Sequence, residues 1–430
     1  MRLPRSPAAP APAGHAWLFD LLFTGTSTVT WAAAGALPPG FDRAEQFAAL
    51  PSGGGRVFMV SLAARPGASS ALTSYNALRS GRRRLARSVL GLGLRSGLAQ
   101  PLLRDKIDIG VVSGATPGQL ADDLLFRHLQ ELLGHGPVVI ALGGGGGPYS
   151  KPVLQVFSSG GTPLGYVKVG WNDWTREAVR REAAALRACA TRQMRIGVPE
   201  LLDRSTWRGL DLVVTAPLPP GVRRVGTAAG LPNAGLLREI SELSPVYAGE
   251  LATSPWWLGI RCRIQAGVTD PEARAALVQA TERIERAHGG VALEFGTWHG
   301  DLVPWNLARL GQRLYAWDWE SSSPDAPLGF DAVHFHFQVA FVARRHPLEQ
   351  AVALAARGAR PVLEQLGIPA AAHALVTALH LIELSVRHEE ARRSSGCIDD
   401  RFYPAVTRVL GRMPALPSAP QGPDTARRAA

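Results

Sequence analysis

One polar segment, residues 297–320, limits the choice of folds for this sequence more than any other feature. Asp301 and Asn306 lie five positions apart, and Pro304 between them prevents a regular helix. Both side chains therefore belong to a loop and can face the same point. The alternative is a buried hairpin whose Asp and Asn side chains only cap turns, but the whole set in order favours a functional site.

A hairpin is predicted directly after this loop. Residues 307–310 and 313–317 are typical of two short strands, and Gly311 predicts the tight turn between them. The hairpin returns Asp318 to the vicinity of Asn306. A carboxylate and an amide oxygen are hard ligands that suit magnesium when nucleotide phosphates and water complete the shell.

Asp301 precedes these two ligands, where it can accept a proton from a substrate hydroxyl. The order His299-Gly300-Asp301, then Asn306, then Asp-Trp-Glu at residues 318–320 resembles the catalytic and metal-binding segments of the aminoglycoside phosphotransferase and choline kinase group. The resemblance implies that Asp301 and His299 are catalytic and that Asn306 and Asp318 hold Mg²⁺.

The resemblance also implies an α+β, bilobal, protein-kinase-like fold. We expect a five-stranded antiparallel N-lobe at residues 136–221 and a mainly helical C-lobe at residues 222–415. Residues 1–135 form an N-terminal extension whose architecture the sequence does not reveal, and residues 416–430 are typical of a disordered tail. Short strand patterns separated by turns support the N-lobe, at Val138–Leu142, Val153–Ser158, Gly165–Val169, Pro199–Thr206 and Leu210–Thr215.

The glycine run between the first two of these strands can bring backbone N–H groups close to phosphate oxygens. It includes Gly144, Gly145 and Gly146. A flexible hairpin tip is an equal alternative, because the Gly-Lys-Ser/Thr ending of a P-loop is missing. In the resembling group the nucleotide base contacts the backbone of the inter-lobe linker, which here makes Thr215 and Leu218 candidates.

Lys168 and Glu182 are predicted to form an ion pair. The 46 basic residues include only three lysines, at positions 106, 151 and 168, so a lysine within a strand indicates a specific need for a compact ammonium group. Glu182 lies on the apolar stripe of a helix that begins near Asp173, where an unpaired carboxylate would be costly. The pair matches the lysine and helix glutamate that contact nucleotide phosphates in kinases; a surface salt bridge without a role is the alternative.

Several other histidines are weaker candidates. His334 and His336 recur at strand spacing and His380 with Glu383 at helical spacing, but neither pair has a third metal ligand at a sensible distance. We expect these residues to be buried or surface-exposed polar positions on helices. Asp331 matches an aspartate that, in the resembling group, ties the catalytic loop to the next helix.

In the N-terminal extension, residues 69–103 predict a basic helix interrupted by glycines, and residues 119–133 predict a single helix. The arginine run 82–87 favours a solvated helix face, since no aromatic side chains interleave with it to stack on nucleic-acid bases. A membrane-surface helix is the less favoured alternative, because glycines weaken a helix and aromatic anchors are missing.

The composition is consistent with a globular, cytoplasmic protein. No apolar run has the length of a membrane span, the proline-rich N-terminus lacks the apolar core of a secretory signal, and three distant cysteines support neither a disulfide framework nor a zinc site. The net charge of +11 does not by itself identify a partner, and we expect no nucleic acid.

Together these patterns predict a phosphotransferase that uses ATP (or GTP) and Mg²⁺ to phosphorylate a hydroxyl of a small molecule. The alternatives are a catalytically silent nucleotide-binding regulator or scaffold, and a protein kinase, which Gly300 disfavours because an arginine is usual there. The acceptor and the oligomeric state are not encoded in any recognisable pattern.

Overall fold

The computed structural model describes residues 16–51, 57–74, 81–144, 151–227 and 231–395, and the chain divides into two compact units. The first unit contains residues 1–183 and 199–224, and the second contains residues 184–198 and 225–430. Within the described residues, none of the helices combines the length and apolarity that a membrane crossing needs. The predicted domain boundaries stay predictions.

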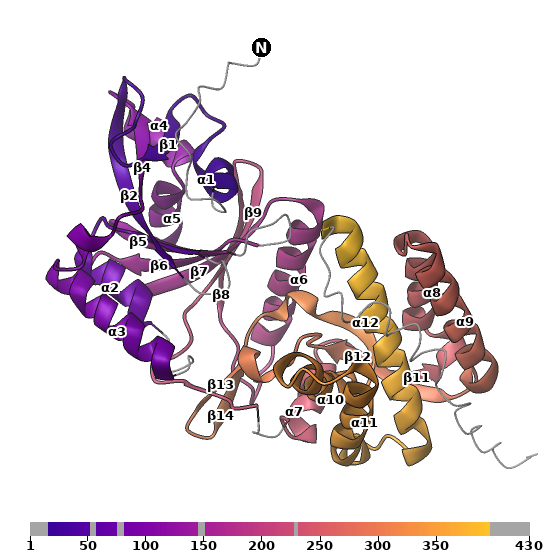
Figure 1. Ribbon diagram of the computed structural model, residues 1–430. Helices are drawn as coiled ribbons and strands as arrows, with labels where there is room; N and C mark the ends of the chain where they lie inside the picture. The colour runs from indigo at the N-terminus through magenta and orange to yellow at the C-terminus, as the bar shows by residue number, and fades with distance from the viewer. Residues whose placement is uncertain (1–15, 52–56, 75–80, 145–150, 228–230, 396–430) are drawn as a thin grey trace, which may run out of the picture. The chain divides into compact units, whose positions relative to one another are not determined.

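The first unit is built on one nine-stranded antiparallel sheet (Figure 1). The strands follow the order β1-β4-β2-β3-β5-β6-β7-β9-β8. Their bounds are β1 Val29–Ala33, β2 Phe41–Pro51, β3 Val57–Ser61, β4 Lys106–Val112, β5 Val138–Gly144, β6 Val153–Ser158, β7 Pro163–Gly170, β8 Leu201–Trp207 and β9 Leu210–Thr215.

The predicted α+β class is confirmed, but the predicted number of five strands is wrong. The five predicted strands correspond to β5–β9, and the N-terminal region adds four more through an antiparallel pairing in which Val57 lies opposite Gly144 and Val60 opposite Ala141. The sequence analysis missed this pairing because helices separate β3 from β4 and β4 from β5, so β3 and β5 lie far apart in the chain. A bulge in β2 at Arg43/Glu45 also disturbs the alternation along that strand.

Helices cover both faces of this sheet. Successive residues of a strand point to opposite faces, so one strand contacts helices on both sides. Val138, Ile140 and Leu142 of β5 pack with the helices α1 and α5, whereas Val139 and Ala141 pack with α2. The helices of this unit are α1 Ala16–Phe23, α2 Arg65–Thr73, α3 Gly81–Ser96, α4 Pro117–Asp123, α5 Leu125–Leu133 and α6 Asp173–Ala190, whose residues beyond Ala183 belong to the second unit.

Two helix predictions in the extension need correction. The predicted helix at residues 119–133 is broken into α4 and α5 by Leu124, whose φ of −105° and ψ of 114° are extended. The basic helix α3 runs without interruption through Gly91 and Gly93 and ends before Gly97, whose φ is +86°. Tertiary packing therefore overrides the low helix propensity of glycine here.

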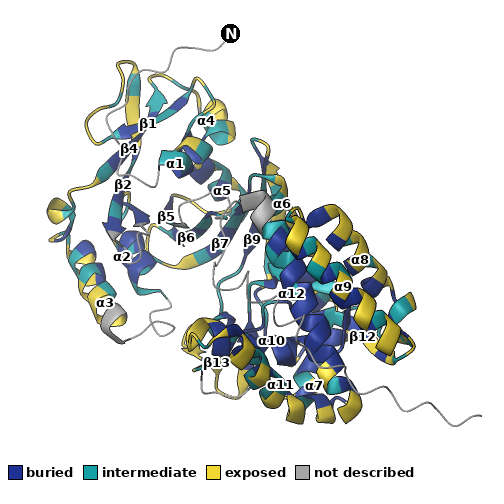
Figure 2. Cartoon of the chain, turned by 45° about the vertical axis from the view of Figure 1, so that its right-hand side comes forward, coloured by how far each residue is buried: buried dark blue, intermediate teal, exposed yellow. Residues whose placement is uncertain are grey.

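The second unit is mainly helical, as predicted. Its helices are α7 Ala234–Ser241, α8 Pro255–Gly267, α9 Pro271–His288, α10 Phe330–Gln338, α11 Leu348–Gln365 and α12 His373–Ser395. Asp270 caps α9 at its predicted start by accepting a hydrogen bond from Ala273 N at 2.8 Å. Figure 2 shows that α10 and the central part of α12 are buried.

Short strands deliver the polar loop of this unit. β11 Tyr247–Glu250, β12 Ala292–Trp298 and β15 Ser323–Pro327 form an antiparallel sheet, and β12 ends where the loop begins. The predicted hairpin is confirmed as β13 Leu307–Leu310 and β14 Arg313–Ala316, with Gly311 in the turn.

Candidate functional site

The loop after β12 is tied to α10 by one buried carboxylate. The backbone N–H groups of His299 and Gly300 donate to Asp331 Oδ2 and Oδ1 at 2.8 and 3.2 Å. Burial raises the pKa of Asp331, while the neighbouring His299 and the two backbone donors lower it. Asp331 therefore has the structural role that the sequence predicted, and it fixes the course of the loop just before Asp301.

Glycine is the one residue type that position 300 of this loop can accommodate. The φ of Gly300 is +80°, and a Cβ atom would lie 2.1 Å from the carbonyl oxygen of Ser321 and 2.9 Å from Nη1 of Arg387. A side chain would clash with backbone that cannot yield. Steric crowding therefore explains why position 300 does not carry the arginine that is usual in protein kinases.

The Asp301 carboxylate is held by a donor on each oxygen. Nε2 of His334 lies 3.2 Å from Oδ1, and Nδ2 of Asn306 donates to Oδ2 at 2.8 Å. The side chain of Asp301 is still 34% exposed, so a substrate can reach it. These contacts fix the orientation of a carboxylate that remains open to solvent on one side.

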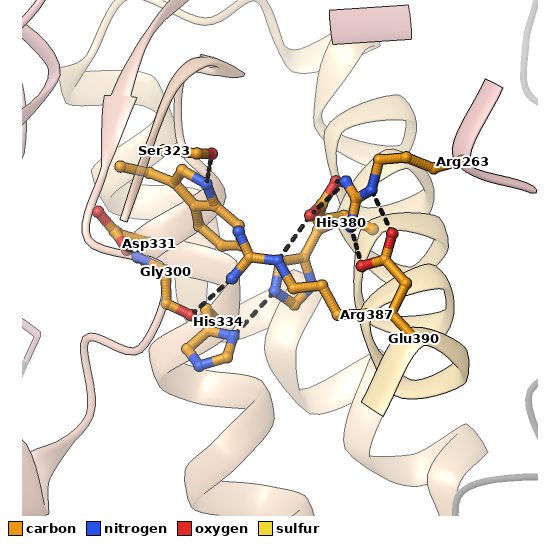
Figure 3. Close-up of polar contacts among 10 residues, drawn as sticks. Arg263, Gly300, Ser323, Asp331, His334, His380, Arg387 and Glu390 are labelled. Carbon is orange, nitrogen blue, oxygen red and sulfur yellow. Dashed lines mark hydrogen bonds and ion pairs between the residues drawn. The ribbon is translucent and has the colours of Figure 1, made fainter. Parts of the chain in front are cut away.

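A second histidine supports the first. Nδ1 of His334 lies 3.2 Å from Nε2 of His380, as Figure 3 shows, and both rings are buried. Burial lowers the pKa of His380 well below its ordinary value, and electrostatic interactions with its neighbours His334 and Arg387 lower it further. A neutral His380 that donates from Nε2 leaves Nδ1 of His334 as acceptor and its Nε2–H as the donor to Asp301.

The sequence prediction missed this histidine chain because it considered His334 only as a metal ligand paired with His336, and otherwise as an ordinary polar position on a helix. His334 lies in α10, three residues after Asp331, and this spacing puts both side chains on the same helix face toward the loop. Helical spacing between Asp331 and His334 was the available signal. The structure therefore gives His334 a contact with Asp301 and not the paired metal-ligand arrangement with His336.

An ion network around the buried Glu383 lies behind the loop (Figure 3). Glu383 accepts from Arg387 Nε at 2.6 Å and from Arg263 Nη1 at 3.1 Å, and Arg263 also donates to Glu390. Burial alone would raise the pKa of Glu383, but the two arginines outweigh it and lower the pKa. Nη1 of Arg387 also donates to Gly300 O at 3.4 Å, which connects the network to the loop.

Trp298 completes this support. The Arg387 guanidinium lies 4.3 Å from the centre of its ring, within the range of a cation–π contact, and the indole N–H donates to Ser323 Oγ at 2.9 Å. Glu383 is thus engaged by arginines. The structure gives no support to a metal site formed by His380 and Glu383.

The predicted metal ligands lie at the two ends of the hairpin. Trp317 N donates to Asn306 O at 3.2 Å, so the residue before Asp318 contacts Asn306 directly. Asp318 adopts a left-handed φ of 71°, a conformation that is uncommon outside glycine and is frequent at functional sites. A carboxylate oxygen of Glu320 lies within 4.8 Å of one from Asp318, which adds a ligand candidate that the sequence prediction did not include.

His299 has no access to a substrate in this conformation. Its ring is fully buried, packs at a tilt against Trp319 with 4.4 Å between ring centres, and accepts from Asp301 N through Nδ1 at 3.2 Å. Burial lowers the pKa of His299, although three nearby aspartates raise it. These contacts shape the backbone around Asp301, and a direct catalytic role for His299 stays a prediction.

In the first unit, the predicted ion pair is confirmed. Nζ of Lys168 lies 2.6 Å from Oε2 of Glu182, and their side chains are 16% and 3% exposed. Lys168 lies opposite Val213 in the sheet, on the face that α6 covers through Val179 and Ala183. The Lys168 side chain is therefore mostly shielded from solvent, and a buried carboxylate orients its ammonium group.

The other predicted nucleotide contacts are less constrained. Gly144 ends β5, whereas Gly145 and Gly146 lie outside the described residues. Thr215 ends β9 and is buried, and Leu218 in the following segment is half-buried. Their roles toward a nucleotide stay predictions.

No protein-family profile and no curated protein matches the sequence. Similar solved structures include a thermostable mutant of the aminoglycoside phosphotransferase APH(4)-Ia, with 15% identity, a TM-score of 0.42 and coverage of 67% of this chain and 100% of that one. Choline kinase LicA from Streptococcus pneumoniae has 14% identity, a TM-score of 0.35 and coverage of 60% and 89%. A choline/ethanolamine kinase family protein from Mesorhizobium loti has 14% identity, a TM-score of 0.35 and coverage of 63% and 87%.

Proposed function

We propose that this protein is a phosphotransferase that moves the γ-phosphate of ATP or GTP to a hydroxyl group of a small molecule. The observation that carries the proposal is the Asp301 carboxylate, which is partly exposed while His334 and Asn306 hold both of its oxygens. A catalytic base needs this combination of fixed orientation and access. Small-molecule kinases such as choline kinase are among the similar structures.

In the proposed reaction, the hydroxyl oxygen of the acceptor forms a bond to the γ-phosphorus while Asp301 accepts the proton of that hydroxyl group. The bond from phosphorus to the β,γ-bridging oxygen breaks, and the nucleoside diphosphate leaves with that electron pair. Lys168, oriented by Glu182, contacts phosphate oxygens. Backbone N–H groups near Gly144 and the segment from Thr215 to Leu218 contribute to nucleotide binding.

The residues of the second unit fit a magnesium ion. Asn306 directs its amide nitrogen to Asp301, which places the hard oxygen donor on the other side of the amide, and Asp318 and Glu320 bring two carboxylates together. A bound Mg²⁺ would neutralise phosphate charge. Asn306 and Asp318 are the proposed ligands, with Glu320 as an additional one.

The test compares Asp301→Asn with wild type in turnover and in nucleotide affinity. We expect turnover to fall by about 10²-fold or more with nearly unchanged affinity, because the amide keeps the shape but cannot accept a proton. A panel of hydroxylated metabolites supplies acceptors, and slow hydrolysis of ATP is the fallback measurement. Equal turnover in the two proteins would favour the silent nucleotide-binding regulator instead.

Asp318→Ala provides the matched test of the metal site. We expect calorimetry to show weaker nucleotide binding in the presence of Mg²⁺, whereas binding measured with the metal chelated should be the same as in wild type. Equal binding of nucleotide and Mg²⁺ by both proteins would remove Asp318 from the proposed ligands.

A further inference from the structure

The helix α3 and the turn after it carry an aliphatic ridge that no described residue covers. Leu85, Val89 and Leu92 are 68%, 64% and 68% exposed, and Leu98 and Leu102 are each 77% exposed. A monomeric protein rarely exposes several large aliphatic side chains on one short segment. The ridge contains none of the residues that we propose to bind the nucleotide or to act in catalysis.

The opposite side of α3 is well packed, so the exposure of the ridge is not a sign of a loose helix. Leu94 is buried with residues of α2, and Figure 1 shows α3 beside α2. Gly91 permits this close contact, because a Cβ atom there would lie 2.7 Å from Thr73 Cγ2 of α2. Gly93 permits the turn after α3 to pack on the helix, because its Cβ atom would lie 2.9 Å from Ala99 Cβ. The glycines that weaken the helix in the sequence therefore have a packing function.

The ridge belongs to the most basic part of the chain. Residues 46–104 contain no aspartate or glutamate and nine arginines, which supply most of the net charge of +11. On α3, the exposed Arg84 and Arg95 lie beside the ridge at helical spacing. Arg87 instead turns inward and donates to the carbonyl groups of Leu72 and Ala71. The surface is thus apolar in the middle and cationic at its margin.

We propose that this ridge docks the protein on the surface of an anionic phospholipid bilayer. An amphipathic helix with aliphatic residues on one side and arginines at the margin inserts at the level of the headgroups, where guanidinium groups meet lipid phosphates. A second copy of the chain would bring two arginine-rich surfaces together, which like-charge repulsion opposes. Nucleic acid would match the charge but not the exposed leucines.

The experiment measures binding of the full chain to sedimented vesicles of two compositions. One contains only phosphatidylcholine, and the other contains equal parts of phosphatidylcholine and phosphatidylglycerol. We expect binding to the anionic vesicles that weakens as salt is added, and little binding to the neutral ones. The variant L85Q/V89Q/L92Q should bind the anionic vesicles at least roughly tenfold more weakly.

A matched control replaces exposed leucines elsewhere in the chain, as L202Q/L258Q/L310Q, and should bind like wild type. Glutamine is a good helix former, so circular dichroism of the ridge variant should match that of wild type. The second variant, R84Q/R95Q, keeps the ridge and should weaken binding by about fivefold per arginine. It gives an independent answer if the ridge variant loses helix content.

Three results would overturn the proposal. The first is equal binding of wild type to both vesicle types or to neither. The second is an equal loss of binding in the control variant. The third is self-association without lipid that the ridge variant abolishes, which would assign the ridge to a second copy. None of these results depends on phosphotransfer activity, so failure here leaves the proposed function untouched.

Discussion

Two buried glutamates, one in each unit, have pKa values that move in opposite directions. Glu45 lies at the bulge of β2, and burial raises its pKa to about 7, although hydrogen bonds from Gln46, Ser61 and Ala63 lower it. Glu383 in α12 is at least as buried, yet Arg387 and Arg263 lower its pKa. Neutral donors therefore do not compensate for desolvation in this protein, whereas two guanidinium groups do.

The two glutamates also differ in whether they are connected to the loop that carries the proposed base. The hydrogen bonds that lower the pKa of Glu45 come from Gln46 of its own strand, from Ser61 at the end of β3 and from Ala63 just after it. Glu383 is connected through Arg387 to the carbonyl group of Gly300, one residue before the proposed base. A charged carboxylate in the second unit thus supports the loop. Each of the following variants tests one element of this contrast.

The largest effect is expected for Glu383→Gln. Removing the carboxylate leaves Arg387 without its ion-pair partner and leaves Arg263 with Glu390 alone, and we expect the free energy of unfolding to fall by about 3 kcal/mol near neutral pH. Since the folded pKa is lowered, this stabilisation is present above the unfolded pKa and is lost as pH falls through the folded one. Urea unfolding measures it, with the exposed Glu364→Gln as control. Equal stability of the two variants would contradict the network.

Glu45→Gln should have the opposite sign. The folded state of wild type binds the proton more tightly, so stability falls as pH rises from the unfolded pKa of 4.5 toward about 7. The variant lacks this loss and should be more stable than wild type by about 3 kcal/mol at about pH 8, with a smaller difference at about pH 5. The exposed Glu131→Gln serves as control. A variant that is less stable at the higher pH would show that Glu45 stays ionised in the fold.

Glu182, with one lysine partner, lies between these two cases. Lys168→Met and Glu182→Gln should each destabilise the protein and lower activity, and the double variant should lose less than the sum by about 1–3 kcal/mol. A double-mutant cycle on unfolding free energies, repeated on turnover, measures this coupling. Additive losses would mean that the two side chains do not interact in solution.

The smallest effect is expected at His334. His334→Leu removes the donor to Asp301 Oδ1 and should lower turnover by roughly tenfold without changing the KM for nucleotide. His334→Gln retains an N–H near the position of Nε2 and should recover much of the loss. Equal turnover in the two variants would show that His334 only fills space.

Contacts between residues close in the sequence were predictable, and contacts between distant segments of the chain were not. The hairpin, the Asp270 cap and the Lys168–Glu182 pair depend on spacing within about fifteen residues or on the cost of a buried charge, and the structure confirms them. The contact of His334 was missed because its partner Asp301 is 33 residues away, so no local spacing connects the two side chains. The pairing of β3 with β5 was missed for the same reason, since register across 80 residues leaves no local pattern.

That pairing has a consequence for folding and solubility. In a chain shortened to begin at residue 136, the backbone groups of β5 that bond to β3 would face water as an open strand edge, flanked by the apolar side chains of Val138, Ile140 and Leu142. Such an edge is a template for pairing with other chains and for aggregation. The N-terminal strands therefore protect the rest of the sheet from self-association through this edge, during and after folding.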